Sequence, residues 1–162
     1  MTHNPYYKLY LIVILTLVFI KCAKEYGDQP YSIGEISDTT LQIEVSEFQN
    51  EDGRLVIALF NNHNDFLSET CLDTSVNINK ELTTLLINNI QYGNYAISVF
   101  HDEDNNGELT ENLFLGTIPI PMEGYGFSNN PPIIASAPSY QDCKFYIESG
   151  QKLVVPIELH YF

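Results

Sequence analysis

The densest group of chemically capable side chains in this sequence is the stretch 101–114, HDEDNNGELTENLF. Asp102, Asp104 and Asn106 carry side-chain oxygens at alternate positions, and Gly107 follows where the chain must turn sharply. The same spacing opens calcium loops of the EF-hand type, because Ca²⁺ prefers several hard oxygen ligands. The stretch therefore predicts a Ca²⁺ site.

The later ligands of such a loop are less regular here. On the EF-hand template the backbone carbonyl of Glu108 is the next ligand, whereas the last position, which needs a bidentate acid, is occupied by Leu113. Glu111 is the nearest acid, and the flanking segments look like strands, so a true EF-hand is not expected. The expected ligand set is Asp102, Asp104, Asn106, Glu108 and Glu111. The alternative is a metal-free acidic turn, in which Asp and Asn side chains bond their own backbone.

His101 begins this stretch and has two alternative interpretations. Strand parity puts it on the same face as Ile97 and Val99, which predicts a hydrogen-bonded histidine at the rim of the core. A position that faces a ligand is the alternative. The four histidines of the chain show no HxH or HExxH spacing, so a zinc site has little support.

The composition limits the classes of partner. The chain has 162 residues, with 7 Lys and Arg against 21 Asp and Glu, and a formal net charge of −14. This excess of acid argues against nucleic acid and against docking on anionic lipid, since both reward clustered basic side chains. Divalent cations or basic partners are favoured, and solubility is the alternative explanation of the charge.

The N-terminus resembles an export signal. Lys8 precedes an apolar run, Leu9–Ile20, that is shorter than the roughly 17 to 25 residues of a membrane span and fits a signal core of roughly 7 to 15 residues. Cys22 follows Lys21 at the end of the run, as in the lipobox of bacterial lipoproteins, although a small residue usually precedes that cysteine. We expect a lipoprotein-like signal peptide over residues 1–21 and lipidation of Cys22. An ordinary cleaved signal and an uncleaved anchor are the alternatives, and all three export the rest of the chain.

The remaining chain divides into a tether and one domain. Residues 22–37 mix charge, Gly and Pro, which is typical of a tether, and residues 38–162 are expected to form a single domain. The domain contains two further cysteines, Cys71 and Cys143. An oxidising compartment permits a disulfide between them, and two buried free thiols are an equal alternative.

Apolar periodicity predicts an all-β domain. Residues 40–46 alternate polar and apolar side chains, whereas residues 54–60 are apolar on both faces, as in a central strand. Pro156 cannot donate to a ladder, so the last strand should lie at a sheet edge or carry a bulge. The expected strands are Thr40–Ser46, Arg54–Phe60, Ser75–Asn79, Leu82–Ile87, Asn94–His101, Cys143–Ile147 and Leu153–Tyr161. About seven strands with regular turns predict a single β-sandwich of immunoglobulin-like or prealbumin-like kind.

Three strings of residues resemble a known family. Residues 92–102 read YGNYAISVFHD and run into an Asn-Gly loop, residues 123–130 read EGYGFSNN, and residues 137–145 read APSYQDCKF. In this order they resemble the DUF2141 family of bacterial exported proteins, over about residues 40–161. Ala137 stands where the family usually has Gly, and Cys143 where it usually has Ala.

The resemblance implies export and a β-rich domain but no activity. It draws attention to residues 123–129, which combine two glycines, two aromatic residues and polar groups. One interpretation is a rigid surface that faces a ligand or supports the metal loop, formed by His101, Glu123, Tyr125, Phe127, Ser128 and Asn129. The alternative is a two-glycine turn whose aromatic side chains fill the end of the sandwich.

These observations favour a non-enzymatic module of the cell envelope, stabilised by Ca²⁺, whose loops bind a ligand or protein that the sequence does not identify. Membrane contact is expected only through the N-terminal lipid or anchor. A structural accessory domain of an envelope assembly is the alternative. A hydrolase using Asp102, Glu103 or Glu123 near His101 has less support, because nothing in the sequence fixes the separation of the two carboxylates.

Overall fold

The computed structural model describes residues 38–115, 117–133 and 136–162. The described residues from 38 onward belong to one compact unit. The signal peptide, the tether and Cys22 lie outside the described residues. Within the described part of the chain, no helix is long and apolar enough to cross a membrane.

The domain is all-β, as the periodicity predicts. Its described residues form ten strands and one helix of four residues, which is more strands than the seven or so expected. The elements are β1 (Thr40–Ser46), β2 (Arg54–Phe60), β3 (Leu72–Val76), β4 (Thr83–Asn88), β5 (Gly93–Asp102), β6 (Glu111–Phe114), β7 (Ile118–Pro121), β8 (Tyr125–Phe127), α2 (Tyr140–Cys143), β9 (Phe145–Ile147) and β10 (Lys152–Glu158).

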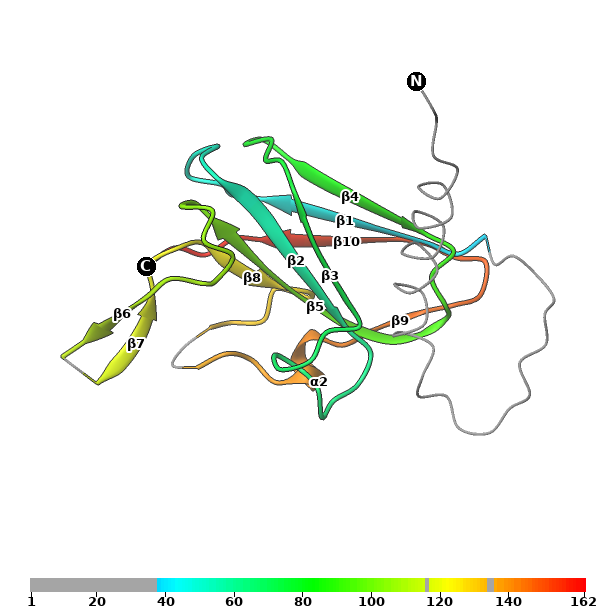
Figure 1. The fold of residues 1–162 in the computed structure, drawn as a ribbon. Helices are drawn as coiled ribbons and strands as arrows, with labels where there is room; N and C mark the ends of the chain where they lie inside the picture. Colours follow the sequence, from blue (N-terminus) through cyan, green and yellow to red (C-terminus); the bar gives the residue numbers. More distant parts are fainter. Residues whose placement is uncertain (1–37, 116, 134–135) are drawn as a thin grey trace, which may run out of the picture. The chain divides into compact units, whose positions relative to one another are not determined.

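The strands form two main sheets and a separate hairpin (Figure 1). The first sheet has the order β10-β1-β4, and the second has the order β3-β2-β5-β8, with β9 pairing a further part of β5. Only β1 and β10 run parallel; every other described pair is antiparallel. The pair β6–β7 belongs to neither sheet.

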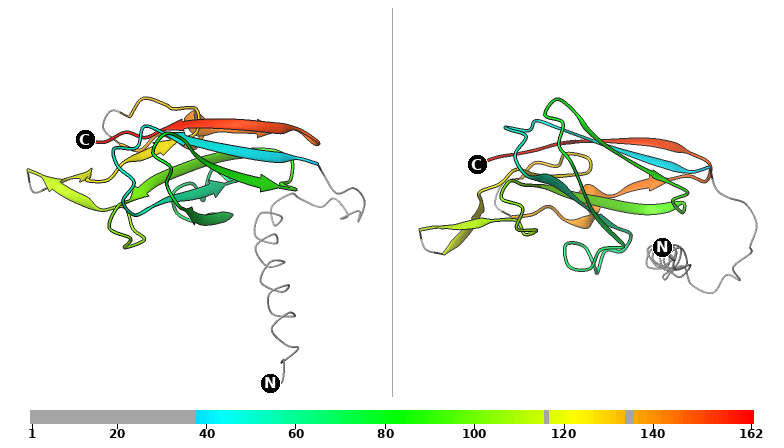
Figure 2. Two further views of the ribbon diagram at one scale, coloured as in Figure 1. Left: turned by 90° about the horizontal axis from the view of Figure 1, so that it is seen from above. Right: turned by 45° about the horizontal axis from the view of Figure 1, so that its top comes forward.

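Side-chain alternation explains how the two sheets meet. Every second residue of β1 is fully buried, as is every second residue of β2 from Leu55 to Leu59. These apolar faces turn toward one another, and Figure 2 shows the two sheets stacked. Residues packed between them include Leu41, Ile43, Val45, Leu55, Ile57, Leu59, Ile97 and Ile157.

The five-stranded sheet is covered on its other face as well. Phe60 and Ala96 are direct cross-strand neighbours there, and they pack with Phe127, Tyr140 and Cys143. This second apolar cluster lies beneath the short helix α2. It explains why residues 54–60 are apolar on both faces, and β2 does lie between two neighbours, β3 and β5.

Pro156 occupies the position predicted for it. The strand β10 is the outer member of its sheet, and Pro156 is exposed while its neighbours Val155 and Ile157 are buried. Two expectations need correction. The third strand covers Leu72–Val76 rather than residues 75–79, and Cys143 ends α2 instead of starting a strand.

Cys71 and Cys143 do not form the disulfide considered from the sequence, because Cys143 is a free, buried thiol. Its side chain packs into the apolar cluster beneath α2. Burial, and to a smaller extent the charge of Asp142, raises the pKa of the Cys143 thiol to about 12. Cys71 is not free either, and its backbone N–H bonds Leu59.

Candidate metal centre

Asp102 is the last residue of β5, and its side chain is fully buried. Arg54 of β2 stands opposite it in the strand register and donates from Nε to Oδ2 at 3.1 Å. The N–H groups of Asn106 and Gly107 donate to Oδ1 and Oδ2 at 2.9 and 3.1 Å. Burial alone raises the pKa of this carboxyl, but these hydrogen bonds and the Arg54 charge outweigh it, so the net pKa is lowered. Asp102 is thus held as a carboxylate that folds the following loop back onto itself.

Gly53 determines how closely the preceding turn approaches this site. Its φ is +69°, and a Cβ atom at this position would overlap the carbonyl oxygen of Asp102. The turn between β1 and β2 therefore crosses over the end of β5 only because residue 53 is glycine.

Asn106 organises the exposed part of the loop. Its backbone N–H and its Nδ2 donate to the two carboxylate oxygens of Asp104 at 3.0 and 2.9 Å, and Nδ2 also donates to Thr110. Its Oδ1 accepts the N–H of Glu108 at 2.7 Å. Side chains of the loop thus bond its own backbone, as in an acidic turn, and Asn106 adds side chain–side chain bonds to Asp104 and Thr110.

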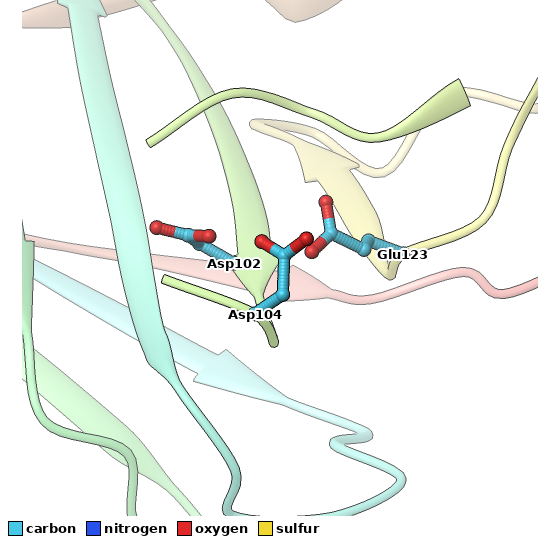
Figure 3. Close-up of side chains that lie close together, drawn as sticks. All are labelled: Asp102, Asp104 and Glu123. Atoms are coloured by element: carbon cyan, nitrogen blue, oxygen red, sulfur yellow. The ribbon is translucent and has the colours of Figure 1, made fainter. Parts of the chain in front are cut away.

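Glu123 completes the cluster from a different part of the chain. Its side chain is buried, and its two oxygens accept the N–H groups of Glu103 at 2.9 Å and Thr110 at 2.8 Å. Oxygen atoms of Asp102, Asp104 and Glu123 all lie within 4.8 Å of one another. Figure 3 shows the three carboxylates gathered in one region, between the end of β5 and the segment that leads into β8.

The cluster has the chemistry of a hard-cation site. It offers carboxylate oxygens from three side chains, and Arg54 is the cation that directly pairs with one of them. Carboxylates this close repel one another unless a cation or a hydrogen-bond donor intervenes. A divalent ion bound here would connect the loop after β5 to the segment before β8.

The cluster differs from the predicted ligand set. It includes Asp102 and Asp104 but not the exposed side chain of Glu111, and the Asn106 oxygen is turned to a backbone N–H. The ligand expected from Glu108 was its backbone carbonyl, which is not a side-chain member of such a cluster. Glu123 was expected to face a ligand or to support the metal loop, but not to be a ligand itself. Its closeness to Asp102 depends on the β6–β7 pairing, which returns the chain to its starting point. The one signal in the sequence was that Glu123 is the acid of the EGYGFSNN string.

His101 is sealed inside the domain. Its side chain is fully buried, Nε2 lies 2.6 Å from the carbonyl oxygen of Asp52, and Nδ1 lies 2.8 Å from the Tyr161 hydroxyl. Since a carbonyl only accepts, Nε2 carries a proton. Phe48 and Tyr161 pack edge-on against the ring. His101 is therefore the hydrogen-bonded core histidine that strand parity predicts, and it does not face solvent.

The aromatic segment after Glu123 is also mostly buried. Tyr125, Phe127 and Ser128 are each less than a tenth exposed, which agrees with the alternative that they fill the end of the sheets. The Ser128 hydroxyl donates to the Cys143 carbonyl at 2.6 Å. Asn129 is exposed, but its Nδ2 bonds the carbonyls of Asp142 and Lys144. The segment therefore joins β5, β8 and α2 instead of presenting a ligand surface.

Comparison with known proteins gives one match. A family described as "Uncharacterized protein conserved in bacteria (DUF2141)" matches residues 43–154. No curated protein and no solved structure matches the chain.

Proposed function

This chain belongs to the DUF2141 family, and on that premise we propose that it is a non-enzymatic binding module of the bacterial cell envelope. In this proposal the cluster of Asp102, Asp104 and Glu123 takes Ca²⁺ and thereby fixes the loops that meet a partner. The family description names no activity, so the proposal rests on the geometry of this domain.

The observation that carries the proposal is the convergence of three carboxylates from two separated loops within 4.8 Å. Two of them are buried, and buried carboxylates need hydrogen-bond donors or cations around them. Backbone N–H groups and Arg54 bond both oxygens of Asp102 and of Glu123. An ion with several oxygen ligands, which Ca²⁺ favours, would reduce the remaining repulsion among the three charges.

The environment of His101 supports a binding role over hydrolysis. A general base needs a nitrogen that can reach a substrate, but both ring nitrogens of His101 are bonded within the protein.

Two finer features belong to the same proposal. The stacked sheets form a sandwich of the prealbumin-like or immunoglobulin-like kind, extended by the β6–β7 hairpin. The N-terminal apolar run exports the chain, and lipidation of Cys22 anchors it in the envelope. Mass spectrometry of the mature N-terminus from bacterial membranes tests this anchoring, and an unmodified cysteine contradicts it.

The calcium proposal is tested by thermal unfolding of the full chain in nonionic detergent, with Ca²⁺, Mg²⁺ or a chelator. Saturating Ca²⁺ at 100 times its dissociation constant adds about 2.7 kcal/mol to the free energy of unfolding, a shift of several degrees in Tm. Mg²⁺ should add less, because it keeps its water ligands more strongly.

Matched variants identify the ligands. Asp104→Asn and Glu123→Gln should abolish the calcium shift, whereas Glu111→Gln, an exposed acid on the same loop, should leave it intact. No calcium shift at millimolar concentration, or an equal loss in all three variants, would contradict the site.

A second candidate function is an accessory domain of a larger envelope assembly. It is favoured by exposed apolar side chains on the β6–β7 hairpin, among them Leu113 and Leu115.

A further inference from the structure

The β6–β7 hairpin stands apart from the rest of the domain. Its strands pair with each other and with no other described strand, and Figure 1 shows them projecting beyond the two sheets. An isolated two-stranded hairpin is at best marginally stable in water. This one therefore lacks the covering that the other strands have.

The hairpin is also apolar. Leu113 is 58% exposed and Leu115 is 80% exposed, and Met122 at the end of the hairpin is 59% exposed. Single exposed apolar residues are ordinary, as for Leu86 on β4, but here several lie on one small projection. Burying such side chains against a partner stabilises a complex by roughly 25 cal/mol per Å².

The edges of the hairpin have few backbone N–H groups for a further strand. Met122 donates its N–H to Thr110 across the pair, and ladder donors alternate, so Pro119 and Pro121 occupy the outward donor positions of β7. Proline has no N–H to offer there. On β6, the N–H of Leu113 donates to the side chain of Asn112 at 2.8 Å. The hairpin therefore offers few backbone donors to a further strand, and its exposed side chains are the main surface for a partner.

The root of the hairpin is the carboxylate cluster. Thr110 immediately precedes β6, and Glu123 follows β7 with one residue between; the two are joined by the bond from the Thr110 N–H to Glu123. The direction of the hairpin is thus set by the same side chain that joins the two loops. A cation in the cluster would make this root more rigid.

The hairpin lies at the end of the domain opposite to the start of β1. Thr40 pairs with Asn88, close to where β5 begins, whereas the hairpin follows the end of β5 at Asp102. Ten residues of strand span about 30 Å. Figure 1 shows β1 beginning at one end of the sheets and the hairpin leaving from the other. A domain held from its N-terminal side presents the hairpin away from the point of attachment.

The negative charge of the hairpin region limits which molecule can cover its apolar side chains. Residues 108–123 contain the exposed acids Glu108 and Glu111 and no Lys or Arg, and the whole chain carries a net charge of −14. A second copy of the chain and an anionic lipid surface both repel such a hairpin. An apolar groove bordered by basic side chains complements both the leucines and the acids around them.

We propose that the β6–β7 hairpin is a docking arm that inserts Leu113 and Leu115 into an apolar groove bordered by Lys or Arg on another envelope protein. This inference rests on the proposed function as a binding module and names the partner's chemistry. The carboxylate cluster fixes the arm, and the arm makes the contact.

The first test is photocrosslinking with the full chain in the bacterial cells that make it. A benzophenone amino acid replaces Leu115 at the tip or, as the matched control, Leu86, which is 51% exposed on β4. We expect an adduct with one other protein from position 115 and none from position 86. The mapped attachment site should be apolar and neighbour a Lys or Arg. Glu108→Gln combined with Glu111→Gln should lower the adduct yield several-fold.

The other outcomes overturn the proposal. An adduct of two copies of the chain makes the arm a self-association surface. An attachment site without basic neighbours, an equal yield from position 86, or no adduct from position 115 each contradicts the groove.

A second measurement tests whether the tip of the hairpin enters a lipid bilayer. The chain contains no Trp, so Leu115→Trp introduces a single reporter at the tip, and Leu86→Trp is again the control. The full chain is reconstituted in vesicles of brominated phosphatidylcholine, a quencher of Trp fluorescence. We expect equal emission in brominated and unbrominated vesicles at both positions. Quenching at 115 alone assigns the tip to lipid and overturns the proposal.

These two experiments test the calcium site and the docking arm separately. Loss of the calcium shift with crosslinking intact removes the metal and keeps the arm. A normal calcium shift without crosslinking removes the arm and keeps the metal-stabilised loop.

Discussion

Gly124 and Tyr161 meet so closely that a methyl group on Gly124 would overlap the Tyr161 ring. Gly124→Ala should therefore push Tyr161 away from His101 and lower the free energy of unfolding by about 1–3 kcal/mol, as overpacking does. Urea denaturation measures the change. In a Tyr161→Ala background the same substitution should cost little, because the overlap is gone. Equal costs in both backgrounds would contradict this packing.

Cys143 should make the domain sensitive to alkali. Burial, aided by the Asp142 charge, raises its folded pKa from 9.0 to about 12, so the folded state keeps a proton that the unfolded chain loses. The stabilisation is fully present below pH 9 and is lost as the pH rises toward 12. Denaturant unfolding between pH 8 and 11 should show this fall, and Cys143→Ala should flatten it. An unchanged slope would assign the alkaline loss to other groups, such as Tyr95, whose pKa burial also raises.

At the scale of single elements, the side chain of Glu123 holds both the loop after β5 and the residue that precedes the β6–β7 hairpin. Glu123→Gln replaces one of two acceptor oxygens with a donor, so the N–H of either Glu103 or Thr110 loses its partner. Hydrogen exchange of these two amides should become faster, while the free energy of global unfolding falls by about 1–3 kcal/mol. Glu111→Gln is the control. Unchanged protection at both amides would show that Glu123 does not hold the hairpin.

The sequence predicts elements well where burial dictates their pattern. The bounds of β1 and β2 agree with the prediction because every second residue enters the core, which fixes the register. The hairpin was not predicted, because its apolar side chains lie on both faces and Pro119 and Pro121 look like strand breakers. The third strand was placed too late in the chain, since residues 72–76 show little apolar alternation.

The sequence predicts two of the three carboxylates of the candidate site, Asp102 and Asp104, but not Glu123 as a ligand. Asp102 and Asp104 are neighbours along the chain, so spacing alone brings them together. Glu123 joins them only after the hairpin has paired and Met122 has bonded Thr110. A contact that depends on such a pairing leaves no local trace in the sequence. Glu111 was expected as the acid nearest to the last template position, which Leu113 occupies, but its side chain is exposed and lies outside the cluster.

At the scale of the whole molecule, the C-terminal residues close one end of the domain. His160 exchanges two backbone hydrogen bonds with Tyr125, and Tyr161 packs on His101 and bonds its Nδ1. Deleting residues 160–162 should lower the free energy of unfolding by about 2–4 kcal/mol, since each lost hydrogen bond contributes about 1 kcal/mol and ring packing adds to it.

Thermal unfolding of the truncated chain against Phe162→Ala checks this role. Phe162 is 77% exposed and stacks on Tyr125, so its removal should cost less than about 1 kcal/mol. Similar Tm values for the truncated and full-length chains would mean that the C-terminal residues are dispensable.

The parallel pairing of β1 with β10 also sets an order of events in time. The first strand of the domain has its neighbour at the far end of the chain, from Thr40 beside Lys152 to Ser46 beside Glu158. During synthesis, β1 has no neighbour on its β10 side until more than a hundred later residues have been made. Its core residues Leu41, Ile43 and Val45 are covered on that side only then. Until then the nascent chain keeps an open sheet edge, whose unpaired backbone groups are available to pair with another chain.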